Sequence, residues 1–289
     1  MRAEAAGAGR VPAILPLRAT TFGESLDGAI VLLRRRALPL LLVAAVLAAG
    51  EQVLLTSLRA DAGLVPPFYL PGADAGDWWR TVVTGLAAEV GIIGLLGAYA
   101  GAATGPALLG RVAGGWRLWL RTRPWWSVPV ALLLAALAWP AGWAGLIGLV
   151  VLYGLFGLAT PLLTLDRVPG PLAALGRSAR LSTRGGLRVA RIRIVGYLTW
   201  LGIRFALGTG WIAVASLVTD VTDVSGADWL HWALPIAWAL ANTVAYAALA
   251  CLDAVLLVEA RIRTEGLDIV LGRARARGED DAAALVAGR

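Results

Sequence analysis

Long apolar segments alternate with short polar stretches along this chain of 289 residues. A helix needs about 20 apolar residues to cross a bilayer core of about 30 Å. The segments that reach this length are residues 37–58, 79–110, 194–218 and 229–257, and the stretch 125–165 is long enough for two more. The pattern predicts an all-α, polytopic integral membrane protein with about six transmembrane helices in three hairpins. A shallow re-entrant pair over 125–165 is the alternative to two full spans there.

Basic segments between the apolar ones predict the orientation. The longest, residues 166–193, carries seven arginines, and two more basic stretches cover residues 111–123 and 259–277. Arginine-rich loops are retained on the cytoplasmic side, so we expect these segments and both termini to be cytoplasmic. Arg34–Arg36 before an apolar run is also typical of a signal peptide. The apolar run continues to about residue 58, however, which favours a span.

The chain divides into three regions. We expect a disordered cytoplasmic tail over 1–20, a six-span helical domain over 21–268 and a second cytoplasmic tail, helical at first, over 269–289. Thr21 and Glu24 have the spacing of a capping box, which predicts a helix over 22–36. That helix either lies at the inner membrane surface or forms the cytoplasmic start of the first span.

The composition limits the chemistry. The chain is 58% hydrophobic and 16% charged, with a net charge of +7, and its 26 basic residues are all arginine. A single Cys251 excludes an internal disulfide, and a single His231 excludes a metal site built from several histidines. The chain has no GxSxG, HExxH or phosphate-binding loop motif. We therefore expect no enzymatic activity, no metal and no cofactor.

Four ionisable residues fall within the predicted spans: Glu51, Glu89, Arg204 and Asp253. A charge near the bilayer centre costs about 2.5–3.5 kcal/mol on insertion scales, so each should find a partner or water. Their depths predict a Glu89–Arg204 ion pair, with Glu51 as the competing partner of the arginine. Asp253 is expected near the inner surface, either solvated or paired with Arg261. Such residues either line a proton or solute path or form a structural ion pair.

Two further features concern lipid and helix packing. Arg177, Arg180 and Arg184 follow an apolar segment and are candidates for contact with anionic lipid headgroups; the alternative is that they only determine topology. The basic stretch 111–123 is interleaved with tryptophan. This combination indicates a segment that lies on the inner leaflet of the membrane, and not one that binds nucleic acid. Gly97, Gly101 and Gly105 form overlapping small-xxx-small units, which predict close helix packing.

Three short stretches resemble a known family. They are residues 22–28 (FGESLDG), 161–178 with PLLTLD, GP and ALGRS, and 259–268 (EARIRTEGLD). Together they are similar to the bacterial membrane-domain family associated with glycerophosphoryl diester phosphodiesterases. The resemblance implies a six-helix membrane domain in the bacterial inner membrane. It implies no phosphodiesterase activity, because the catalytic domain that sometimes accompanies this module is absent from the sequence.

These observations lead to one main functional expectation and one alternative. The main expectation is a non-catalytic membrane scaffold or a partner-binding or lipid-binding module, whose partner is the bilayer together with another membrane protein or a second copy. The alternative is a small-solute or proton-linked transporter that uses Glu51, Glu89 and Arg204. A polar cavity reaching these residues would favour transport, and dry, tightly packed spans would favour the scaffold.

Overall fold

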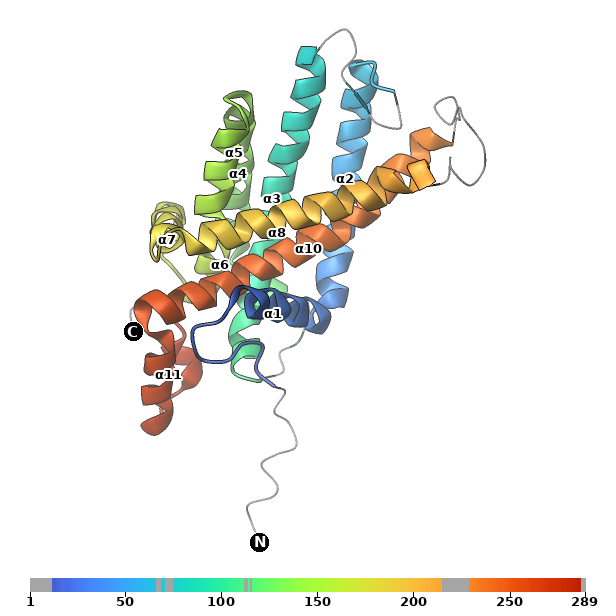
Figure 1. Cartoon of the computed structure of the whole chain (residues 1–289). Coiled ribbons are helices and arrows are strands. Elements are labelled where there is room, and N and C mark those ends of the chain that lie inside the picture. Colours follow the sequence, from blue (N-terminus) through green and yellow to red (C-terminus); the bar gives the residue numbers. More distant parts are fainter. Residues whose placement is uncertain are drawn as a thin grey trace.

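The computed structural model describes residues 12–65, 69–70, 75–111, 114, 116–214 and 229–286. All regular secondary structure in these residues is helical, as the apolar pattern predicted (Figure 1). Five segments are long and apolar enough to cross a membrane, which confirms the coarse prediction of a multi-span membrane protein. They are α2 (Ala37–Asp61), α3 (Ala75–Leu108), α4 (Pro124–Trp143), the segment Leu146–Asp166 and α10 (Leu230–Glu265).

The segment Leu146–Asp166 is a broken helix. Its pieces are α5 (Leu146–Phe156), α6 (Ala159–Pro161) and a π-helical turn, η2 (Leu162–Asp166). Gly145, with a φ of 94°, makes the turn that joins α4 to it. Two linking elements complete this part of the chain: η1 (Trp116–Arg121) before α4 and α7 (Pro171–Thr183) after η2.

The predicted span over 194–218 starts earlier than expected. Its helix, α8, covers Arg188–Phe205 and continues through a π-helical turn, η3 (Ala206–Gly210). α8 carries four arginines in its 18 residues, which is why it is less apolar than the five segments above. The predicted span extends beyond residue 214, and residues 215–218 lie outside the described part of the chain.

α10 is the central helix of the molecule. It contacts α1, α2, α3 and α8, and it lies alongside α8 while both run obliquely across α2 and α3 (Figure 1). Every side chain from residue 245 to residue 262 is buried. A helix that is apolar on all sides packs inside a bundle, and the many alanines of this stretch let neighbouring helices approach closely.

The glycine stripe of α3 allows the close packing that its spacing predicted. A Cβ on Gly97 would lie 2.9 Å from Thr160 Oγ1, and one on Gly101 would lie 2.7 Å from the Cα of Pro161. The broken segment around α6 therefore packs directly against the backbone of α3, and larger residues at these positions would separate the two.

The predicted capping box is present at the start of α1 (Phe22–Arg35). Thr21 Oγ1 accepts from the Glu24 amide at 3.3 Å, and Glu24 Oε2 accepts from the Thr21 amide at 2.7 Å. α1 ends at Arg35, and the next residue, Arg36, has a non-helical φ of −122° that separates α1 from α2. α1 then lies across α10, at an angle to α2 (Figure 1), so it is a separate helix and not the first turns of α2.

Parts of both regions that were expected to be cytoplasmic tails are folded in the structure. Ile14 and Leu15 are buried in the main core, and Leu15 packs over Gly28 of α1. At the other end, α11 (Leu267–Ala276) and α12 (Asp281–Ala284) are followed by a buried Leu285. These short apolar stretches have no periodicity that the sequence could show, and they order because the folded domain offers them a surface.

Candidate functional site

Polar side chains with the same spacing lie on facing sides of α8 and α10. At 3.6 residues per turn, positions i, i+4 and i+11 return to one helix face. The two sets are Arg193, Tyr197 and Arg204 on α8, and Asn242, Tyr246 and Asp253 on α10. The helices run antiparallel, so the start of the α8 set meets the end of the α10 set. A polar stripe thus runs along the interface of α8 and α10.

The predicted ion pair between Glu89 of α3 and Arg204 of α8 is present. Their Oε1 and Nη1 atoms are 2.8 Å apart, and the two residues are only 4% and 3% exposed. The Tyr197 hydroxyl donates to Glu89 Oε2 at 3.2 Å. The Arg204 guanidinium also lies 5.5 and 5.4 Å from the ring centroids of Tyr197 and Tyr246. Opposite charge and two aromatic faces together compensate for burying the guanidinium.

Glu51 of α2 does not compete for this arginine. Its carboxylate accepts from the Tyr246 hydroxyl, at 2.9 Å on Oε1 and 2.8 Å on Oε2. The Asn242 amide donates to Oε2 at 3.1 Å. Glu51 is 6% exposed, and no cation of the described residues lies within ion-pair distance of it. The carboxylate is therefore held by neutral donors alone.

These groups line one large cavity between α2, α3, α5, α8 and α10. Its volume is about 670 Å³, and Glu51, Glu89 and Arg204 lie in its wall. Most of the remaining lining is apolar or aromatic: Leu55, Tyr69, Trp78, Leu86, Leu149, Leu198, Phe205 and Trp238. Leu146 of α5 and Leu198 of α8 line it and are 55% and 57% exposed, so the cavity reaches the surface between these two helices.

Asp253 corrects our expectation of a solvated residue or a partner of Arg261. It is 2% exposed and accepts two hydrogen bonds from Arg193, at 2.5 Å and 2.9 Å. The Tyr153 ring lies 3.9 Å from the Arg193 guanidinium. Gly157 makes room for this arginine, because a Cβ there would overlap the guanidinium. The expectation failed because depth along α10 does not show which side of the helix a residue faces.

A second, small cavity of about 20 Å³ lies beside this pair, a size that fits one water molecule. Arg193 and Asp253 line it, and Tyr153 lines both this cavity and the large one. The rings of Tyr153 and Tyr197 are 4.9 Å apart. The neighbouring rings of Tyr197 and Tyr153 thus link the Glu89–Arg204 pair to Arg193 and Asp253.

Arg177, a candidate for contact with lipid, is instead held by carboxylates. Its guanidinium lies 3.0 Å from Asp166 and 2.8 Å from Glu265. Arg261 completes the cluster with bonds of 2.6 Å to Asp166 and 3.2 Å to Glu265, and it also donates to the Leu285 carbonyl at 2.6 Å. This cluster joins η2, α7 and α10 to the C-terminal segment. The partners are up to 95 positions apart in sequence, so spacing could not reveal them.

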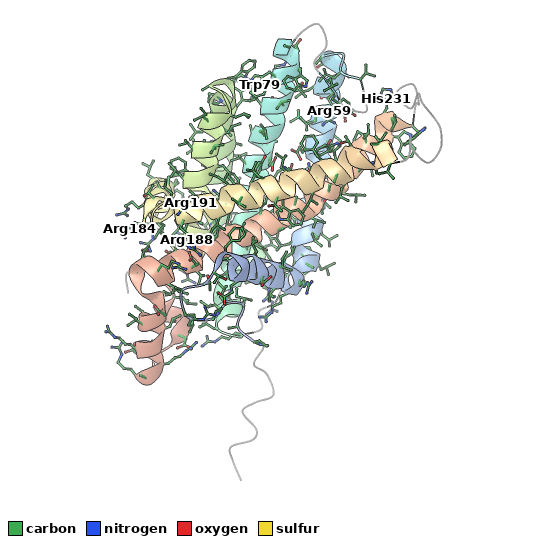
Figure 2. All side chains as sticks on the ribbon, viewed as in Figure 1. Arg59, Trp79, Arg184, Arg188, Arg191 and His231 are labelled. Atoms are coloured by element: carbon green, nitrogen blue, oxygen red, sulfur yellow. The ribbon has the colours of Figure 1, made fainter. Side chains whose placement is uncertain are left out.

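The other two lipid candidates, Arg180 and Arg184, are exposed near the junction of α7 and α8. Arg191 is exposed in the same region, and Figure 2 shows Arg184, Arg188 and Arg191 close to one another there. Arg188 is bound to Glu259, 3.1 Å away, and donates to the Thr20 carbonyl at 3.0 Å. Glu259 also pairs with Arg263. At the junction of α7 and α8, the exposed basic surface is therefore formed by Arg180, Arg184 and Arg191.

Sequence reasoning missed five residues of the site: Tyr153, Arg193, Tyr197, Asn242 and Tyr246. The shared spacing on α8 and α10 was the signal that would have found most of them.

Comparison of the chain with protein-family models, with curated proteins and with solved structures gives no match. In the part of the chain that the structure describes, no three His, Cys, Asp or Glu residues are grouped to hold a metal ion.

Proposed function

We propose that the protein is a six-span protein of the bacterial inner membrane with both termini in the cytoplasm. In this layout α8 and its continuation form the fifth span, and α4 and the segment Leu146–Asp166 form two full spans. The exposed Arg180, Arg184 and Arg191 support it, because exposed arginines close to a span are typical of a cytoplasmic loop. The family resemblance in residues 22–28 and 259–268 implies the same layout.

Within that layout, the function that the geometry supports best is non-catalytic binding of an amphiphilic, lipid-like molecule. The large cavity carries this proposal. Its volume of about 670 Å³ falls in the range of small-molecule sites, its walls are apolar and its polar groups are few. An opening between α5 and α8, lined by exposed leucines, suits a molecule that enters from the lipid.

A non-catalytic role fits the chemistry of the cavity wall. No Ser, Cys or His of the described residues lines it, so neither a Ser–His nor a Cys–His nucleophile pair is present in this wall. A scaffold made only of packed spans would gain nothing from retaining a cavity with buried charges, because burying them is costly. Binding of a ligand would account for both the cavity and the charged groups in its wall.

The test fills the cavity from its exposed wall. Val150→Trp places an indole in the cavity from α5, at a residue that is 46% exposed and so has room to change. Val46→Trp on α2 is the matched control, since Val46 is 73% exposed and does not line the cavity. We expect mass spectrometry of protein purified in a mild detergent to find a bound amphiphile in the wild type and in V46W, and to find it lost from V150W. Equal content in all three would contradict the proposal.

Proton-linked transport is the second candidate, and the polar stripe favours it. The stripe continues beyond the large cavity, through Tyr153, to the buried Arg193–Asp253 pair. Reconstituted vesicles with an internal pH dye would test it. Proton entry that Glu89→Gln or Arg204→Ala abolishes would support transport, and a flux no greater than in empty vesicles would refute it.

Gentle-detergent purification with size measurement would show whether a partner protein or second copy is bound.

A further inference from the structure

The aromatic rings around the large cavity already bind cations. The Arg59 guanidinium lies 4.4 Å from the centroid of the Tyr69 ring, and Arg204 lies between Tyr197 and Tyr246. A cation over an aromatic face is attracted by the ring quadrupole, and the attraction strengthens where water is excluded. The lining therefore has the chemistry of a cation site, and two of its positions are occupied by the protein's own arginines.

The carboxylates of the cavity differ in their partners. Glu89 is bound by Arg204, whereas among the described residues Glu51 is bound only by the Tyr246 hydroxyl and the Asn242 amide. A buried carboxylate without a cation is costly, because neutral hydrogen bonds replace only part of its hydration. A positively charged ligand group therefore gains the most binding free energy next to Glu51.

A second observation at the same position points to a ligand with N–H donors. Asn242 is 3% exposed and presents its amino group to Glu51, which leaves its carbonyl oxygen on the other side of the amide. That oxygen is buried and has no hydrogen-bond partner among the described residues. Asn242 lines the cavity together with Glu51. A donor bound there would complete the hydrogen bonding of the amide.

We propose that the ligand is an amine-bearing amphiphile, whose protonated amino group binds the Glu51 carboxylate and the Asn242 carbonyl oxygen while its apolar chain lies along the cavity wall. This rests on the proposed binding function. A free long-chain amine and an aminophospholipid share this chemistry. For the phospholipid, Arg59 in the cavity wall is the available cation for the phosphate.

The experiment measures binding of dodecylamine, protonated at neutral pH, to the full chain in a neutral maltoside detergent by calorimetry. Glu51→Gln keeps the size of the side chain and an acceptor for Tyr246 but removes the charge. Asp61→Asn is the matched control, because Asp61 is an exposed carboxylate of the same helix that does not line the cavity. We expect E51Q to weaken binding roughly tenfold or more, as loss of a charged hydrogen bond does, and D61N to leave it unchanged.

Two chain-matched probes separate charge from hydrogen bonding. Dodecyltrimethylammonium has the charge but no N–H, and 1-dodecanol has neither the charge nor the N–H groups. We expect both to bind more weakly than dodecylamine, and the alcohol to be insensitive to E51Q. Phosphatidylethanolamine that displaces the amine, where phosphatidylcholine does not, would identify the lipid as the source. Failure of both lipids to displace it would identify the free amine.

The outcomes distinguish the two proposals. If 1-dodecanol binds as tightly as dodecylamine, or if E51Q binds the amine like the wild type, the amine inference is wrong while the cavity remains a binding site. If none of the three dodecyl probes binds and V150W retains the same lipid as the wild type, the proposed function itself fails. Size-exclusion profiles of E51Q and D61N that match the wild type show that both variants are folded.

Discussion

Gly157→Ala tests whether the buried Arg193–Asp253 pair stabilises the junction of α5, α8 and α10. Gly157 follows the last residue of α5, and its backbone φ of −67° is one that alanine adopts freely. The backbone therefore does not oppose the change. The added Cβ would overlap the Arg193 guanidinium, so the arginine has to leave its position over Tyr153.

The magnitude follows from what the displaced arginine leaves behind. Asp253 is 2% exposed and receives both of its ion-pair hydrogen bonds from Arg193. Separating a buried pair leaves an uncompensated charge, which costs about 3–5 kcal/mol. At about 2–4 °C per kcal/mol for a chain of this size class, the midpoint of thermal unfolding falls by roughly 10 °C.

Thermal unfolding in detergent, followed by tryptophan fluorescence, measures the shift. Gly50→Ala is the control, because Gly50 lies in α2 with no atom within 4 Å of an added Cβ. That variant should be at least as stable as the wild type, since alanine favours a helix by about 1 kcal/mol over glycine. In a variant where Arg193→Met and Asp253→Asn remove both charges, G157A should lower the midpoint of thermal unfolding far less. The same loss in that background would refute the ion-pair reasoning.

Two further predictions concern other charges. Glu89→Gln and Arg204→Gln should each lower the free energy of unfolding by about 3–5 kcal/mol, because each leaves one buried charge without its partner. The double variant should lose less stability than the sum of the two single losses, and additive losses in thermal unfolding would contradict a paired role. Arg18, and after it the Thr21 amide, lowers the pKa of Glu24 to about 2. A lowered pKa stabilises the fold above the unfolded value of about 4.3, and the effect is lost as the pH falls toward 2. Hydrogen exchange at the start of α1, corrected for intrinsic rates, should therefore rise below roughly pH 4 in the wild type and show no such step in Glu24→Gln.

The amino-acid sequence by itself determined where the helices lie. The lengths of the apolar segments predicted most ends of α2, α3, α4 and α10 to within one helical turn. They could do so because a span needs about 20 apolar residues, whichever helices it packs against. The capping box at Thr21 and Glu24 was also readable, since both of its hydrogen bonds are local. The Glu89–Arg204 pair was predictable because two opposite charges at the same depth have few other partners.

Only the tertiary structure decided which way each helix faces. Rotation of α8 and α10 about their axes brings Arg193 to Asp253, and Arg261, which depth had suggested, goes instead to Asp166. The same packing pairs Arg177 with carboxylates and leaves Glu51, in the cavity wall, without an ion-pair partner among the described residues. Depth in a membrane is a property of the local sequence. Sequence spacing can show which polar residues share one face of a helix, but the neighbour that this face meets depends on how all the helices pack together.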